Sequence, residues 1–208
     1  MYAIIEDGSI SRYINYPKAI TIGDVQYPAK IFSAWTANEL AAIGIIEVTF
    51  DDSNKKNEQW YTNTNQTYTY DASAGTVTAT YGTATAKAHA DTLFTAQDET
   101  DGLGTEGEVK VEGLKTVLIR TVKAQAEGLL NQTDWYITRK AEKNIAIPSA
   151  ITTWRDGIRT KQAAMETSIT NASNTPALET LYTYVNTADE GDPKVMERPL
   201  GEFPELGS

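Results

Sequence analysis

One stretch of the chain, residues 114–171, shows sustained helical periodicity, and it constrains the fold more than any other feature. Apolar residues recur at spacings of three and four, the pattern of one helix face, at Leu114, Val117, Leu118, Val122, Ala126 and Leu129. A polar break at 131–134 and the proline at position 148 divide the stretch, because short polar side chains cap helices and proline disfavours helical geometry in the preceding residue. The pattern predicts three consecutive helical segments that form one compact unit.

The same stretch inverts the charge of the chain. It carries nine Lys and Arg against five Asp and Glu, a net +4, whereas the remaining 150 residues carry nine against 23, a net −14. Together these give the formal net charge of −10. Nonspecific nucleic-acid binding depends on neutralising phosphates, which an acidic chain does poorly. We therefore expect an electrically uneven protein with no nucleic-acid partner.

Composition excludes several classes of site and partner. The chain has no cysteine, which rules out disulfides and thiolate metal sites. It has no apolar run of about 18 residues, the length that indicates a membrane-spanning helix. Its first residues lack the basic segment and the apolar run of a signal peptide. We therefore expect no export signal and no membrane partner.

The first 52 residues have the signals of a small α+β unit. They predict a hairpin over 2–14, a shorter hairpin over 20–28, a helix over 37–43 and a strand over 45–50. Thr36, with Glu39 three residues later, is typical of a capping box at the start of that helix. Gly44 supplies the left-handed position that ends it.

Residues 60–81 alternate β-branched and aromatic side chains around a turn at 71–75, which predicts a Thr-rich β-hairpin. Two interpretations of its edge stay open. The edge strand is exposed to solvent, or another chain docks on it as an additional strand.

The predicted fold class is α+β: a small N-terminal β-rich module with one short helix, the Thr-rich hairpin, and a C-terminal module of three to four helices. Acidic residues and glycines at 98–108 are typical of a linker. The expected divisions are a β-rich module over 1–97, a linker over 98–112, a helical module over 113–190 and an extended tail over 191–208. Thr175 is expected to cap the last helix, with Pro176 at its first position.

No group of residues has the pattern of an active site. His89 is the only histidine and has no clustered partner in the sequence. Asp98, Glu99 and Asp101 lack the spacing of a calcium loop, and Gly102-Leu103-Gly104 lacks the lysine of a phosphate loop. We therefore expect neither enzyme activity nor a metal or other cofactor.

The helical stretch holds a more ordered set of polar residues. Asp134 lies at a predicted helix start, where a carboxylate satisfies free N–H groups, and Arg139 and Glu142 share one helix face. Arg155 or Arg159 on the third segment can pair with these carboxylates across the junction. This is the chemistry of capping and ion pairing.

Two further expectations concern side-chain placement in the same stretch. Trp135 and Trp154 both fall on the apolar side of their segments and are expected to be core residues. The basic residues form a candidate partner-facing surface, and plain solubilising residues are the alternative. These basic residues are Arg120, Lys123, Arg139, Lys140 and Lys143.

The order of residues across the junction resembles the tail assembly chaperone family of tailed bacteriophages. In that family a basic helix ends in Leu-Leu, followed by a polar dipeptide, Ser/Thr-Asp-Trp, and later a proline and an aromatic-Arg pair before Leu-Arg. Ile158-Arg159 stands here where Leu-Arg is usual, and the proline-rich end often seen in the family is missing. The matching residues are Leu130, Thr133, Asp134, Trp135, Arg139, Glu142, Pro148, Trp154, Arg155 and Arg159. Residues 20–28 and 35–45 are also similar to leading modules of phage tail and tail-fibre proteins.

The resemblance implies a non-enzymatic phage protein that binds a tail or tail-fibre protein. One version is an assembly chaperone that acts in the host cytoplasm and then leaves. The alternative is a minor tail, baseplate or fibre-attachment protein that stays in the virion, and either version allows a homo-oligomer. A more remote alternative is a polysaccharide-acting hydrolase with paired carboxylates, but no Asp or Glu pair lies in an aromatic, pocket-like context.

Overall fold

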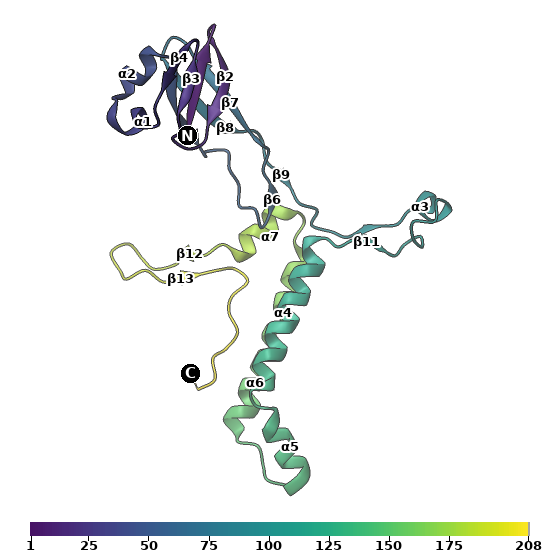
Figure 1. Cartoon of the computed structure of the whole chain (residues 1–208). Helices are drawn as coiled ribbons and strands as arrows, with labels where there is room; N and C mark the ends of the chain where they lie inside the picture. Colours follow the sequence, from purple (N-terminus) through teal and green to yellow (C-terminus); the bar gives the residue numbers. More distant parts are fainter. Residues whose placement is uncertain (208) are drawn as a thin grey trace. The chain divides into compact units, whose positions relative to one another are not determined.

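A computed structural model describes residues 1–207, which separate into two compact units, one over Met1–Thr85 and one that begins at Ala86. The first unit is rich in strands and the second is mainly helical (Figure 1). This confirms the predicted α+β class and the order of its two parts. Among the described residues, no helix is both long and apolar enough to span a membrane.

The first unit is built on a five-stranded mixed sheet with the order β2-β1-β5-β8-β7. Its strands are β1 (Tyr2–Glu6), β2 (Ser9–Ile14), β5 (Ile45–Asp51), β7 (Gln66–Asp71) and β8 (Thr76–Tyr81). The hairpin predicted over 2–14 and the Thr-rich hairpin are confirmed as β1–β2 and β7–β8. The β5–β8 pair is parallel and the other pairs are antiparallel. β5 pairs with β1 through its first half and with β8 through its second half.

The sheet is curled. Tyr13 on β2 and Tyr68 on β7 lie at opposite ends of the strand order, yet their ring centroids are only 4.6 Å apart. The inner side is filled by the small buried residues Ala3, Val77 and Ala79. β7 is an edge strand of this sheet, so the two interpretations of its edge, solvent exposure and docking of another chain, stay open.

A second layer of the first unit consists of β3 (Ile20–Ile22), β4 (Val25–Tyr27), α1 (Ile31–Ala34) and α2 (Ala37–Ala42). The capping box is confirmed, because the amide of Glu39 donates to Thr36 Oγ1 and the amide of Thr36 donates to Glu39 Oε2. Gly44 follows α2 at φ +80°, and a Cβ there would lie 2.6 Å from the carbonyl oxygen of Ile5. The sequence predicted one helix in this module, which corresponds to α2, and the structure has a second short helix, α1, before it. Two more strands of two residues each, β6 (Tyr61–Thr62) and β9 (Thr85–Ala86), form a separate two-stranded sheet.

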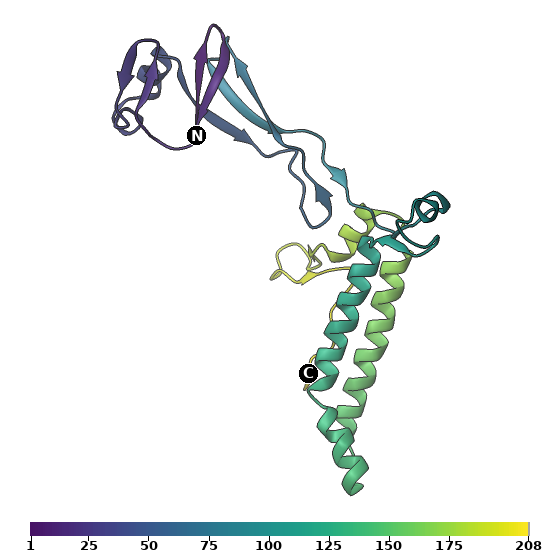
Figure 2. The ribbon, with the colours of Figure 1, turned by 45° about the vertical axis from the view of Figure 1, so that its right-hand side comes forward.

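The second unit is organised around two long helices that lie side by side and antiparallel (Figure 2). They are α4 (Leu114–Asn131) and α6 (Ser149–Asn171), joined through α5 (Asp134–Lys143) and followed by α7 (Thr175–Tyr182). The predicted apolar faces meet between them. The buried residues are Leu118, Val122 and Ala126 of α4 and Trp154, Ile158, Met165 and Ile169 of α6. The helical periodicity of the sequence therefore identified this core.

The stretch expected to be a linker is folded. It forms an arm over residues 92–111, in which β10 (Thr92–Leu93) pairs with β11 (Val109–Val111) and α3 (Ala96–Thr100) lies between them. Thr95 and Asp98 form a capping box at the start of α3, and Lys110 Nζ lies 2.5 Å from Asp98 Oδ1. Asp98 thus caps a helix, and the chain divides between Thr85 and Ala86 instead of within 98–112.

Two more boundaries differ from expectation. Asn174, one residue before the expected cap, is the N-cap of α7, because its Oδ1 accepts from the amide of Ala177 at 2.9 Å. The buried Thr175 hydroxyl instead donates to the carbonyl of Lys87 at 2.5 Å. After α7, β12 (Val185–Asn186) and β13 (Met196–Glu197) form a ribbon over 185–197, so the helical module does not extend to residue 190.

Each unit is expected to fold when expressed alone, because each has its own buried core. Fragments 1–85 and 86–208 should each give a cooperative thermal transition by circular dichroism. The division after residue 85 cuts only the two-residue strand β9, whereas a division at residue 97 cuts through α3 and places part of the second unit with the first, so it should serve worse. Noncooperative melting of both 1–85 and 86–208 would show that the units depend on one another.

Protonation of Asp98 is expected to loosen the arm in acid. The Lys110 ammonium, together with the amide and hydroxyl of Thr95, lowers the pKa of Asp98 from 3.8 to about 2. Because the folded-state pKa is depressed, this carboxylate stabilises the arm above the unfolded value, and the contribution is lost as the pH falls from 3.8 through about 2. An NMR titration of the Thr95 amide measures this, and Asp98→Asn should remove the transition. A Thr95 signal that is constant over that range contradicts the assignment.

Candidate protein-binding site

The ten residues of the family-like motif gather where α4, α5 and α6 meet. They separate into a buried group that fixes the junction and an exposed group on α5. The buried group consists of Thr133, Trp154 and Arg155, with Leu130 packed against them. The exposed group consists of Trp135, Glu142 and their helix neighbours. The two groups have different chemistry.

Arg155 is the centre of the buried group, with only 7% of its surface exposed. Its Nη1 donates to the carbonyl of Leu130 at 2.8 Å and to Thr133 Oγ1 at 2.7 Å, and it lies 2.8 Å from Asp134 Oδ1. The last carbonyls of a helix lack partners within it, and here the guanidinium of α6 supplies one. Arg155 therefore fastens the α4–α5 turn to α6, which confirms the expected ion pair with Asp134.

Trp154, the neighbouring residue, is buried as expected. It packs with Ala126 and Ile158 in the core between α4 and α6. Its indole Nε1 donates to the carbonyl of Pro204 at 2.8 Å. The indole thus has a partner for its one polar group, which a buried tryptophan requires.

Trp135 is not a core residue, and this expectation was wrong. Its side chain is 52% exposed, and α5 contributes no buried residue. Its ring is stacked on Tyr136 with centroids 3.7 Å apart, and the guanidinium of Arg139 lies 4.9 Å and 5.0 Å from the two ring centroids. The side of α5 that carries Trp135 and Ile137 is therefore exposed to solvent.

The remaining motif residues have local roles. Arg159 pairs with Asp156 on its own helix at 3.0 Å, so it does not cross the junction. Pro148 precedes α6, and its carbonyl accepts from the amides of Ile151 and Thr152. Glu142 lies exposed on α5. Of the two arginines considered for pairing across the junction, the structure thus assigns the role to Arg155.

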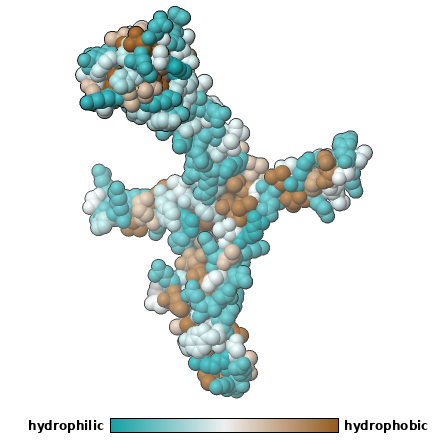
Figure 3. All heavy atoms as spheres, viewed as in Figure 1, coloured by the Kyte–Doolittle hydropathy of each residue, from teal (hydrophilic) through white to brown (hydrophobic). Residues whose placement is uncertain are grey.

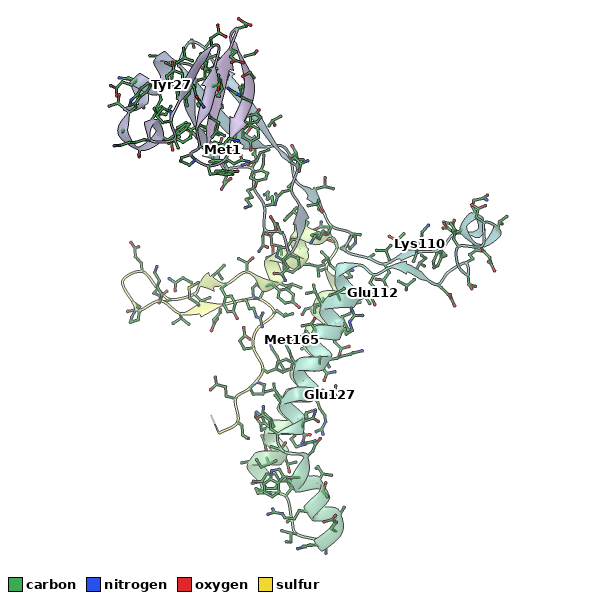
Figure 4. The ribbon with its side chains drawn as sticks, viewed as in Figure 1. Met1, Tyr27, Lys110, Glu112, Glu127 and Met165 are labelled. Carbon is green, nitrogen blue, oxygen red and sulfur yellow. The ribbon has the colours of Figure 1, made fainter. Side chains whose placement is uncertain are left out.

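Of the five basic residues expected to face a partner, those on α4 are paired with carboxylates, so the free positive charge lies on α5. Arg120 makes two hydrogen bonds to Glu112, at 2.6 Å and 2.8 Å, and Glu112 lies at the start of α4 (Figure 4). This contact lowers the pKa of Glu112 and raises that of Arg120. Lys123 pairs with Glu166 at 3.3 Å. Within residues 1–207, Lys140 and Lys143 have no such ion pair, and both are exposed in the last turn of α5.

Sequence reasoning missed two further exposed apolar surfaces in this unit. The arm exposes Leu93, Leu103, Val109 and Val111. Figure 3 shows brown, hydrophobic spheres along this arm. The ribbon exposes Tyr184, Val185, Val195 and Met196. A two-stranded ribbon is marginally stable in water by itself, so both elements gain from being covered. The Val-Lys-Val alternation at 109–111 was the available signal for the arm.

The residues considered for metal or acid–base chemistry are not gathered into a site. Within the described chain, no group of three His, Asp or Glu is placed to hold a metal ion. The carbonyl of His89 accepts from the amide of Lys115, and Asp98 caps α3. The sequence matches no protein-family model, and it has no match among curated proteins or solved structures.

Proposed function

We propose that the chain is a non-enzymatic bacteriophage tail protein, and that it acts through protein–protein contacts in the assembly of a tail or tail fibre. Its binding surface is the tip, which we define as α5 and the loop that follows it, residues 134–148. The partner is an acidic tail or tail-fibre protein. The motif shared with tail assembly chaperones supports the phage assignment, and the chemistry of the tip supports the binding role.

The observation that carries this proposal is an aromatic surface on a helix that buries nothing. Trp135, Tyr136 and Arg139 form one stack, and Ile137 and Ile145 of the tip are each 44% exposed. Tryptophan, tyrosine and arginine are the residues that most often dominate binding energy at protein interfaces. An exposed apolar patch rimmed by charges is typical of an interaction site.

The buried group gives this surface a fixed position. Arg155 holds Thr133 and Asp134, the two residues that immediately precede Trp135. A binding site is effective when neighbouring contacts lock its anchors in place before the partner arrives. The motif thus combines a structural half, centred on Arg155, with a binding half, centred on Trp135.

The charge of the tip indicates an acidic partner. The tip carries Arg139, Lys140 and Lys143 against Asp134 and Glu142, and Asp134 is paired with Arg155. The residues outside 114–171 carry a net −14. Complementary charge steers association and excludes partners of the wrong sign. A second copy of this chain, which also presents acidic surface, is the competing occupant that the tests below distinguish.

Reversing the two charges, Lys140→Glu with Lys143→Glu, is expected to slow association with the acidic partner about tenfold at low salt. The difference should fade as salt rises from about 0.1 M to about 1 M, because the screening length falls from about 10 Å to about 3 Å. Stopped-flow binding to purified tail and fibre proteins of the same phage measures the rates. The melting temperature should change little.

The matched control reverses two exposed lysines of the first unit, Lys18→Glu with Lys30→Glu. It should leave the association rate near that of the unmodified chain. Equal rates for the tip variant and the control at every salt concentration would show that the tip lysines are solubilising residues. Self-association that the tip variant weakens would identify a second copy as the partner instead.

Mass spectrometry of purified phage particles distinguishes the two versions of the role. Copies present in fixed proportion to tail proteins indicate a minor virion component. Absence from particles, together with a complex in infected cells, indicates an assembly chaperone.

A further inference from the structure

The last part of the described chain, residues 198–207, is an extended segment that lies on the surface of α4 and α6, and we call it the C-terminal segment. Leu200 is 3% exposed, and its amide donates to the carbonyl of Leu181 at 3.0 Å. Phe203 packs against the cluster of Ala126, Trp154 and Ile158. The sequence predicted an extended tail here, and the structure shows where it docks.

Two features of α6 fit this segment closely. Trp154 Nε1 donates to the carbonyl of Pro204, and a Cβ on Gly157 would lie 3.3 Å from Pro204 Cγ. Glycine in a helix interior is destabilising compared with alanine. Here the missing side chain leaves room for the proline ring. An aromatic residue followed by proline is thus the recognised element, with Glu202 and Glu205 on either side.

The segment leaves part of its own groove unfilled. The groove continues along the first turns of α6, where Ser149, Ala150, Ile151 and Thr153 line it. Leu206 borders this part and is still 47% exposed. A segment with the same aromatic–proline anchor and a larger apolar residue after it would bury more surface there.

The C-terminal segment is held at a few separate positions by α4, α6 and α7. It follows the ribbon, whose strands pair through two residues each and whose apolar side chains are exposed. Its own contacts are the buried Leu200 beside α7, Phe203 against the cluster of Ala126, Trp154 and Ile158, and the hydrogen bond from Trp154, and an outside segment has to replace those of Phe203 and Pro204. A resident segment of this kind competes with outside ligands through its high effective concentration.

We propose that this surface of α4 and α6 is a peptide-binding groove, and that the C-terminal segment is its built-in competitor. The occupant is a partner's extended segment with an aromatic–proline pair and a larger apolar residue after the proline. The binding of such a segment releases residues 198–207. This site is separate from the tip and does not depend on the phage assignment.

The test uses the full-length chain and a fluorescent synthetic peptide with the sequence of residues 198–207. Phe203→Asp in the chain removes the resident anchor and leaves the groove intact. The peptide is expected to bind this variant at least about tenfold more tightly than the unmodified chain, because the competitor is gone. A peptide with Trp in place of Leu206 should bind more tightly than the natural peptide.

Gly157→Val added to the Phe203→Asp chain should abolish peptide binding, because the valine side chain occupies the place of the proline ring. Circular dichroism verifies that each variant is folded, and Gly157→Ala provides a second, milder block of the groove. Equal peptide binding to the unmodified chain and to Phe203→Asp, absence of binding to both, or binding that Gly157→Val leaves unchanged overturns the proposal. So does a dimer of the unmodified chain that the peptide dissociates, since the occupant would then be a second copy's segment.

Discussion

Replacing Trp154 by alanine is expected to lower the unfolding free energy of the helical unit by about 3–5 kcal/mol. The side chain is 7% exposed and lies between α4 and α6, so its removal leaves a cavity that the two helices cannot close. The change also removes the hydrogen bond to the Pro204 carbonyl. Urea titration of the chain, followed by far-UV circular dichroism, measures the loss.

The same unit supplies a matched control. Trp135→Ala removes an identical side chain from an exposed position on α5 and should change stability by no more than about 0.5 kcal/mol. It should nevertheless weaken partner binding. A Trp135→Ala variant as unstable as Trp154→Ala would show that the tip is part of the core, as the sequence suggested.

The second large effect is expected at Arg155. Arg155→Met keeps much of the side-chain volume but removes the donor for the Leu130 carbonyl and Thr133 Oγ1. The Leu130 carbonyl keeps the amide and the hydroxyl of Thr133 as donors, and Asp134 is exposed enough to regain water, so the main loss is the charged hydrogen bond to the buried Thr133 Oγ1. Hydrogen bonds to charged groups contribute about 1.5–3 kcal/mol. We therefore expect a loss of about 2–3 kcal/mol in unfolding free energy.

Arg159→Met is the control for this prediction, because Arg159 pairs only on its own helix and both partners are exposed. Such surface pairs contribute about 0–1 kcal/mol. Chemical denaturation of both variants gives the comparison. Equal stability of the two variants would mean that the Arg155 network is not what holds the α4–α5 turn.

The elements that the sequence predicted well are those encoded locally. The capping box of Thr36 and Glu39 needs only a spacing of three residues, and the Asp7-Gly8 turn needs only its two residues between apolar runs. The core between α4 and α6 followed from helical periodicity, because both faces are apolar over several turns. These features do not depend on distant parts of the chain.

The predictions failed where a local sequence pattern does not show which other part of the chain a residue packs against. Periodicity placed Trp135 on an apolar face but could not show that no other element lies against that face. The acidic, glycine-rich composition of 98–108 suits a linker, yet the same residues suit helix capping, as Asp98 shows. The parallel pairing of β5 with β8 joins segments far apart in the chain, which no local signal encodes.

The sequence predicted some residues of the candidate site correctly and others incorrectly. The sequence identified Asp134, Arg155 and the lysines of α5, but the pairing of Arg120 and Lys123 required the structure. Their partners, Glu112 and Glu166, lie on an adjoining segment and on another helix. Charge patterning alone therefore overestimated the size of the basic surface.

Photo-cross-linking from the tip tests the central claim most directly. A photoreactive phenylalanine analogue replaces Trp135 in one variant and the exposed Thr160 of α6 in a control variant, and each is combined with tail and fibre proteins of the same phage. We expect a cross-link to one acidic tail or fibre protein from position 135 and none from position 160. A complex that cross-links from position 160 but not from position 135 would contradict it.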